Sequence, residues 1–236
     1  FSSHYPGNPA SLFGHTLLKF SKVTGQGQST SELLDYGLNH AAFPTTLNPF
    51  LYPVMGLSGF FPGYMSLMPY YVKVQEYNNA ESRDLWEYEL NLSETEIHQA
   101  LLSVFELSTR RVDYYYFDDN CSLLMLSIID VARPSLRLVD QFKAWVIPGD
   151  TVRVVFNQKD LVSRIKFRPS NIRRYLELEK RLSKVERESF DALIESKKLN
   201  KFSTVSLSSL TQEQKMNVMD TLLEFIDADE QLAGSK

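Results

Sequence analysis

The sequence predicts an α+β domain with about five mostly antiparallel strands, followed by a C-terminal helical region. The first half of the chain carries short segments in which apolar and aromatic residues alternate between turn residues, as is typical of strands. Most helix signals lie later in the chain, and from Ser170 onward Lys, Arg and Glu recur at helical spacing. Strands and helices in separate runs indicate an α+β class. We therefore expect a core over residues 1–168 and a helical appendage over 169–236.

Composition restricts the classes of function. The chain has 236 residues, of which 43% are hydrophobic, so it can bury a sizeable core. Its net charge of −4 and isoelectric point near 5.6 give no electrostatic case for binding nucleic acid or anionic lipid. No apolar run reaches the roughly 18 residues that span a bilayer. Because the sequence starts at Phe1, we expect a processed or trimmed chain whose signal or anchor lies outside it.

The first two predicted strands form a hairpin. Residues 13–23 and 33–41 flank a turn at 25–29 that is rich in glycine. Centring the turn on Gly27 places His15 opposite Asn39 and Lys19 opposite Asp35, and opposed residues share a face. A slip of one residue would bring Leu38 or His40 to that face instead.

The segment 43–69 combines many aromatic residues with five prolines and three glycines. We expect few regular elements at that density of Pro and Gly. One interpretation is a loop packed on the core. The other is an apolar wall for a greasy substrate, with Phe60, Phe61 and Tyr64 as lining candidates and with Gly56, Gly59 and Gly63 letting the segment open.

Residues 70–77 and 85–92 read as two further strands, the second with clear alternation. Ser93 and Glu96 form a capping box that starts a helix of about 14 residues. A short aromatic strand follows at 114–117.

Cys121 is the only cysteine and opens an apolar run that Pro134 closes, which predicts a buried helix. Asn120 is a suitable N-cap, so the thiol would face unpaired N–H groups and the positive helix end, both of which favour thiolate. The alternative is a small core hydrophobe. One cysteine excludes an internal disulfide and a thiolate-cluster zinc site, and the four histidines lack metal-ligand spacing. We expect no metal and no cofactor.

A cysteine nucleophile needs a base and a group that orients the base. His15 is the strongest base candidate because it starts a strand beside Gly14. Asn39 is the candidate orienting residue, and Asp35 and His40 are the alternatives.

Four motifs together resemble the Lnb-type periplasmic-domain family, which is named for a lipoprotein N-acyltransferase. They are Gly14–Leu18, Tyr70–Tyr77, Arg83–Tyr88 and Asn120–Ser122. The resemblance covers about residues 10–135 and lies within the circularly permuted papain-like superfamily, whose lecithin-retinol-acyltransferase-like members also place His before an Asn-Cys pair. It implies a permuted papain-like core, a periplasmic location in the bacterial envelope and cysteine-dependent acyl chemistry.

We therefore expect acyl transfer or hydrolysis on a lipid or lipoprotein through a thioester on Cys121. His15 would be the base, Asn39 would orient it, and the backbone N–H of Cys121 would stabilise the oxyanion. Segment 43–69 would contact a membrane surface, and a sole cysteine suits an oxidising compartment. A peptidase or amidase acting on envelope peptides would instead need a polar, extended cleft. A catalytically silent binding module would bury Cys121 out of reach of any histidine.

Overall fold

The computed structural model describes residues 1–2, 14–22, 32–46, 48–108, 110, 112–198 and 207–234. The chain forms two compact units. The first comprises Phe1–Val74 and Leu85–Phe167, and the second comprises Gln75–Asp84 and Arg168–Lys236. The second unit thus includes Gln75–Asp84, a segment that the sequence analysis assigned to the core over 1–168. The division into domains at 168/169 stays a prediction.

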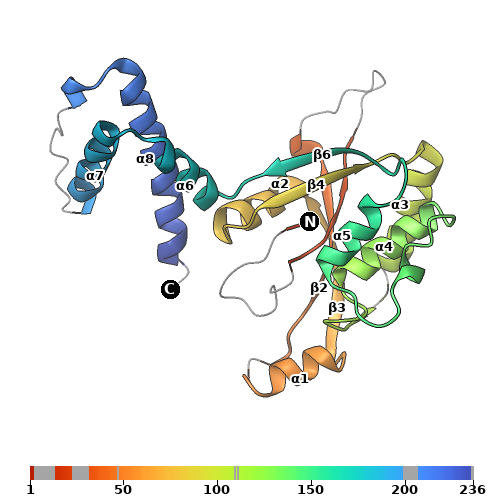
Figure 1. The fold of residues 1–236 in the computed structure, drawn as a ribbon. Helices are drawn as coiled ribbons and strands as arrows, with labels where there is room; N and C mark the ends of the chain where they lie inside the picture. Colours follow the sequence, from red (N-terminus) through yellow and green to blue (C-terminus); the bar gives the residue numbers. More distant parts are fainter. Residues whose placement is uncertain are drawn as a thin grey trace. The chain divides into compact units, whose positions relative to one another are not determined.

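A four-stranded sheet is the centre of the first unit (Figure 1). Its order is β1-β2-β3-β5, and each neighbouring pair is antiparallel. The strands are β1 Leu18–Phe20, β2 Tyr36–Ala42, β3 Phe61–Pro69 and β5 Val112–Tyr114. The α+β class is confirmed.

The hairpin register differs from the prediction by two residues. Lys19 lies opposite Gly37, whereas the prediction placed it opposite Asp35. A shift of two residues keeps every side chain on its predicted face, because side chains alternate with a period of two. The Lys19 ammonium still reaches the buried Asp35 carboxylate, with an Nζ–Oδ2 distance of 2.9 Å.

The prediction of an irregular segment over 43–69 is wrong. This segment contains the helix α1 Leu51–Leu57 and the strand β3, which pairs with β2 from Gly63 to Pro69. Proline is tolerated near strand ends, where few ladder hydrogen bonds are lost. Pro62 and Pro69 lie near the two ends of β3 and leave its middle free to pair.

The predicted strand at 70–77 is also wrong, because the chain is helical there. It forms α2 Tyr70–Val74 and continues as the π-helix η3 Gln75–Ala80. Tyr70, Lys73 and Tyr77 are all buried, at a spacing of three and four residues. That spacing places them on one helical face, and the face outweighs the strand preference of the aromatic residues.

Helix α4 Cys121–Ala132 packs against three other elements of the first unit. They are α3 Glu94–Ser108, α5 Pro148–Phe156 and the short 3₁₀ helix η4 Val139–Gln141. The predicted capping box starts α3: the Ser93 N–H donates to Glu96 Oε2 at 2.7 Å, and the Glu96 N–H donates to Ser93 Oγ at 3.4 Å. One core cluster joins α4 to β2 and α3, and another joins it to α5. A helix that is apolar on all sides is buried in this way.

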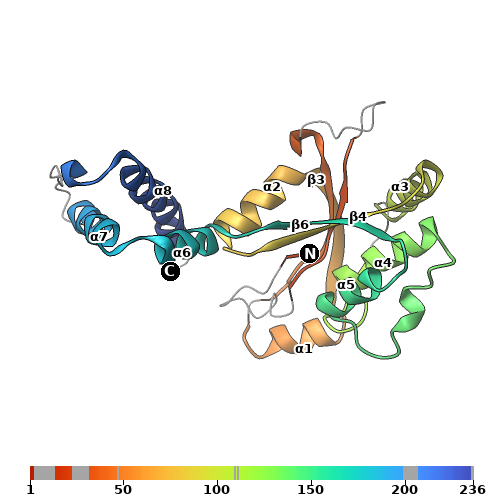
Figure 2. The same cartoon turned by 45° about the horizontal axis from the view of Figure 1, so that its top comes forward.

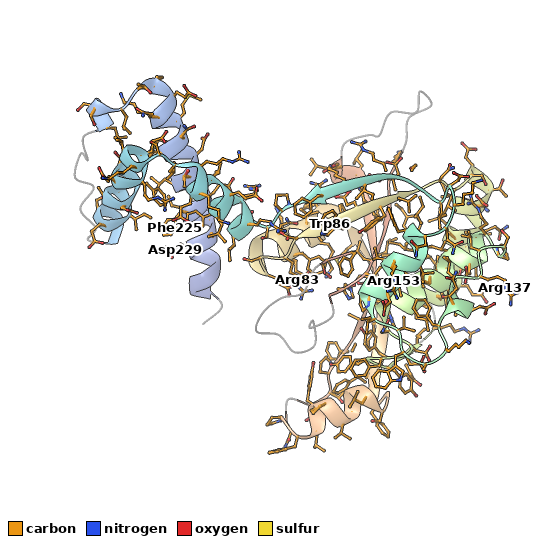
Figure 3. All side chains as sticks on the ribbon, in the orientation of Figure 1. Arg83, Trp86, Arg137, Arg153, Phe225 and Asp229 are labelled. Atoms are coloured by element: carbon orange, nitrogen blue, oxygen red, sulfur yellow. The ribbon has the colours of Figure 1, made fainter. Side chains whose placement is uncertain are left out.

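A second, two-stranded sheet pairs β4 Leu85–Leu90 with β6 Val162–Arg168. The predicted strand over 85–92 is therefore confirmed over most of its length. The Trp86 and Phe167 rings pack with centroids 4.3 Å apart, and Trp86 is labelled in Figure 3.

The second unit is helical, as predicted from Ser170 onward (Figure 2). Its core consists of Leu182, Phe190, Leu210 and Val218. It contains α6 Asn171–Arg181, α7 Lys184–Lys198, α8 Gln212–Gly234, the 3₁₀ helix η5 Leu207–Ser209 and η3, which packs against α8.

Candidate active site

Cys121 is the first residue of α4, and Asn120 is its N-cap, as predicted. The Asn120 backbone is extended, and its Oδ1 accepts hydrogen bonds from the N–H groups of Ser122 at 3.0 Å and Leu123 at 3.2 Å. Its Nδ2 donates to the carbonyls of Val146 at 2.6 Å and Tyr116 at 3.2 Å. Asn120 therefore both starts the helix and ties its first turn to two loops, which fixes the backbone that carries the thiol.

His15 is held by the backbone on both of its sides. Its N–H and C=O form a two-hydrogen-bond bridge with Ser2, with N···O distances of 3.1 and 2.7 Å. The preceding Gly14 has φ +84°, and a Cβ there would lie 2.5 Å from the Ser2 carbonyl oxygen. Only glycine fits this left-handed position. The glycine beside His15 thus serves close backbone packing.

Asn39 contacts the imidazole as predicted. Its Oδ1 lies 2.5 Å from His15 Nε2, and because an amide oxygen only accepts, Nε2 is the donor. This hydrogen bond fixes the orientation of the ring. It occupies Nε2, so Nδ1 is the ring nitrogen that Asn39 does not bind. Of the two alternatives, Asp35 pairs with Lys19, and His40 is buried with no hydrogen-bond partner for either ring nitrogen among the described residues.

The sulfur of Cys121 has three hydrogen-bonding neighbours: the side chains of His15 and Tyr114 and the backbone of Thr16. Cys121 is only 2% exposed, whereas His15 keeps partial exposure. The structure therefore brings His15, Asn39 and Cys121 into one continuous set of contacts, from residues far apart in the chain.

The thiol and the imidazole stabilise each other's charge. Burial raises the pKa of Cys121 and lowers the pKa of His15, because it disfavours both charged forms. The attraction between thiolate and imidazolium, together with their hydrogen bond, acts in the opposite sense and prevails. The pKa of Cys121 lies below its ordinary value and that of His15 above it, despite the nearby positive charge of Lys73. The arrangement favours a thiolate–imidazolium pair.

Tyr114 is a site residue that the sequence analysis missed. It ends β5, is buried, and packs against His40 with ring centroids 5.1 Å apart and ring planes tilted by 44°. Burial first, and then the negative charge of Cys121, raise the pKa of Tyr114, so its hydroxyl remains a donor. The sequence analysis found the aromatic run 114–117 that precedes the sole cysteine. Alternation alone did not show which ring of this run points toward the thiol.

The three substrate-lining candidates lie in different environments. Phe60 is 67% and Tyr64 55% exposed, whereas Phe61 is fully buried. The Phe61 ring packs against Tyr52 with centroids 5.3 Å apart, so Phe61 belongs to the core.

Asp118 and Asp119, just before the cap, are both exposed. Burial first, and then the charge of Asp118, raise the pKa of Asp119. Because both carboxylates are exposed, solvent weakens their electrostatic effect on the Cys121 thiol.

Two further searches cover the described part of the chain only. Within it, no group of His, Cys, Asp and Glu side chains has the arrangement of a metal site. Within the same residues, no helix has both the length and the apolar character that crossing a bilayer requires.

Comparison with known proteins gives one match. The family model described as the Lnb N-terminal periplasmic domain matches residues 1–158, which include His15, Asn39 and Cys121. No curated protein matches the chain, and no solved structure does. The match covers well over half of the sequence, and the chain therefore belongs to the Lnb N-terminal periplasmic domain family and is a periplasmic protein.

Proposed function

We propose that this protein is a cysteine enzyme that transfers or hydrolyses an acyl group of a lipid or lipoprotein in the bacterial envelope. The observation that carries the proposal is the contact of the Cys121 sulfur with His15, which is itself bonded to Asn39. A nucleophile, a base and a residue that orients the base form the minimum set for covalent acyl chemistry.

In the proposed reaction, the Cys121 thiolate attacks the carbonyl carbon of an acyl ester. The carbonyl electron pair moves to oxygen, where the N–H of Cys121 and the Tyr114 hydroxyl would be the donors. In the resting site the N–H bonds to the Tyr114 oxygen and the hydroxyl bonds to the sulfur, so both would exchange these partners for the oxyanion. When the C–O bond breaks, the His15 imidazolium gives its proton to the leaving alcohol. His15 then accepts a proton from the incoming amine or water, which attacks the thioester and releases the thiolate.

Two observations favour this proposal over its alternatives. A silent binding module predicts Cys121 buried and out of reach of any histidine, and the thiol is indeed buried but contacts His15. A peptidase predicts the aromatic residues of 43–69 packed inward, and Phe60 and Tyr64 are exposed. Because Cys121 is 2% exposed, acylation requires local displacement of the side chains around the sulfur.

The test is the acyl-enzyme itself. We expect a long-chain p-nitrophenyl ester to add one acyl group to the folded protein, visible by intact mass and removed by neutral hydroxylamine. Cys121 is the only cysteine, so Cys121→Ser should abolish the hydroxylamine-labile adduct. His15→Ala should slow its formation by about 100-fold or more, in the range of a lost general base. His98→Ala, at an exposed histidine on α3, is the matched control and should react like the wild type.

Labelling with iodoacetamide separates an unsuitable probe from an inert thiol. In the wild type, the labelling rate should rise with pH at a midpoint below the free-cysteine pKa of about 8.5. His15→Ala should move the midpoint upward, because burial then raises the pKa without the opposing imidazolium. Labelling only after denaturation, with no ester adduct, would overturn the proposed function.

A further inference from the structure

The first unit carries an exposed apolar surface at α1, which we call the α1 patch. Phe50 is 83% exposed, Phe60 67% and Phe43 65%, and these are large side chains that a folded domain normally buries. Figures 1 and 2 show α1 beyond the ends of β2 and β3, where no other described helix or strand of the first unit covers its outer side. The patch consists of Phe43, Phe50, Leu51, Val54, Leu57 and Phe60.

Helix α1 is apolar on both of its sides. Leu51, Val54 and Leu57 are more than half exposed on the outer side. On the inner side, Gly56 is buried, and Tyr52 packs near the Tyr116 ring with centroids 6.4 Å apart. A helix that is hydrophobic all round is normally buried in a protein core or in lipid. The inner side has its core, and the outer side lacks an apolar environment among the described residues.

The absence of charged residues around α1 in the sequence favours a bilayer over a protein partner as the environment of the α1 patch. No Asp, Glu, Lys, Arg or His occurs from Ala41 to Val72. The arginines of the first unit that Figure 3 labels, Arg137 and Arg153, lie well away from α1. Protein interfaces surround their apolar centre with a polar rim and are enriched in Arg, whereas a bilayer interface accepts Phe, Leu and Tyr without any charge. The patch itself carries no charged side chain, and the exposed Asp113, opposite Pro62 on β5, adds a carboxylate. This surface therefore matches neutral lipid and gives no attraction to anionic headgroups.

We propose that the α1 patch docks the protein on a phospholipid bilayer by inserting apolar side chains into the interfacial region. Insertion depends on apolar area and therefore needs neither anionic lipid nor low salt. This inference deepens the proposed function, and rests on it for its purpose, because a lipid or lipoprotein substrate is held in a membrane.

The patch is tied to the candidate active site through Tyr116. The hydroxyls of Tyr52 and Tyr116 lie 2.9 Å apart, and the Tyr116 N–H donates to the Gly56 carbonyl at 3.2 Å. A Cβ on Gly56 would lie 2.1 Å from the Tyr116 ring, so this approach requires glycine. The Tyr116 carbonyl accepts from Asn120, the N-cap that precedes Cys121. Docking through α1 would therefore fix the thiol relative to the membrane surface. The glycine serves close packing here, which differs from the predicted role of opening the segment.

The experiment uses Cys121→Ser protein, so that membrane binding is measured independently of acyl chemistry. We expect it to sediment with neutral phosphatidylcholine vesicles, equally at about 0.05 and about 0.5 M salt, conditions that differ strongly in electrostatic screening. Adding phosphatidylglycerol should leave the binding constant unchanged. Phe50→Ser with Phe60→Ser should weaken the partition constant at least about tenfold. Phe105→Ser with Phe156→Ser removes two other exposed phenylalanines of the first unit and is the matched control, with expected wild-type binding.

A single-label measurement reports insertion directly. In the Cys121→Ser background, Phe50→Cys carries one environment-sensitive fluorophore, because the natural chain has no other cysteine. Its emission should shift to shorter wavelength on neutral vesicles, and the same label at Phe105→Cys should not shift. Three outcomes would each overturn the proposal: no vesicle binding, binding only to anionic vesicles and lost at high salt, or a concentration-dependent dimer that the Phe50→Ser, Phe60→Ser change abolishes without any effect of lipid. Docking without acyl-enzyme formation would leave this inference standing and remove the proposed function.

Discussion

Replacing Asn120 tests how one side chain supports the whole site. Asn120→Ala removes the N-cap acceptor of α4, a loss of about 1 kcal/mol. It also leaves the Val146 and Tyr116 carbonyls without their Nδ2 donor, at about 1–3 kcal/mol for each buried acceptor. The sum is about 3–7 kcal/mol, a large part of the roughly 5–15 kcal/mol that stabilises a typical domain.

The assay is thermal unfolding followed by tryptophan fluorescence. Both tryptophans, Trp86 and Trp145, belong to the first unit, so the signal reports the unit that contains Asn120. With a Tm shift of about 2–4 °C per kcal/mol, Asn120→Ala should lower the Tm by about 6–28 °C. Asn157→Ala, at the exposed end of α5, is the control and should shift the Tm by little.

Asn120→Asp separates the two contributions, because it keeps the cap acceptor and loses both amide donors. At neutral pH it should be destabilised, since its carboxylate faces two carbonyl oxygens. Protonation restores one donor and is favoured in the folded state, so the pKa is raised on folding and stability should increase as pH falls. If Asn120→Ala melts within about 1 °C of the wild type, the argued role of Asn120 is refuted.

Two further predictions concern the buried neighbours of the site. Burial first, and then the charge of His15, lower the pKa of His40 to about 4. Neutral His40 therefore contributes to folding stability above pH 6.5, and this contribution is lost as the pH falls from 6.5 through about 4. At pH 5 the loss is about 2 kcal/mol, and His40→Leu should remove it in urea titrations at pH 7 and 5, whereas exposed His98→Leu should not. Tyr114→Phe removes a hydrogen bond to the thiolate and should raise the midpoint of Cys121 labelling by about one pH unit; an unchanged midpoint would exclude that bond.

Local signals in the sequence predicted the start of each well-marked helix. Asn120 caps α4, and Ser93 with Glu96 caps α3, because a cap is made by groups within three residues of each other. The face that carries His15 and Asn39 was predicted as well, although the register was not. A register error of two residues leaves each side chain on the same face, so the predicted shared face of His15 and Asn39 was still correct.

Element type was decided by tertiary contacts where local preference was ambiguous. The segment Tyr70–Tyr77 has strand composition but buries one helical face, and β3 forms despite its terminal prolines because β2 and β5 pair with it. Residues Gln75–Asp84 pack with the C-terminal helices, a long-range choice that no local pattern encodes.

The sequence by itself determined the class of fold, the cap that places Cys121 at a helix start, and the residue types able to form a Cys–His–Asn site. Only the tertiary structure decided which aromatic residues serve that site: Tyr114 contacts the sulfur, Phe61 fills the core, and the adjacent Phe60 is exposed. Capping depends on hydrogen bonds between neighbours in the chain, which composition reveals. Burial of a ring depends on which distant surface covers it, and Phe60 lies just outside β3 whereas Phe61 is its first residue.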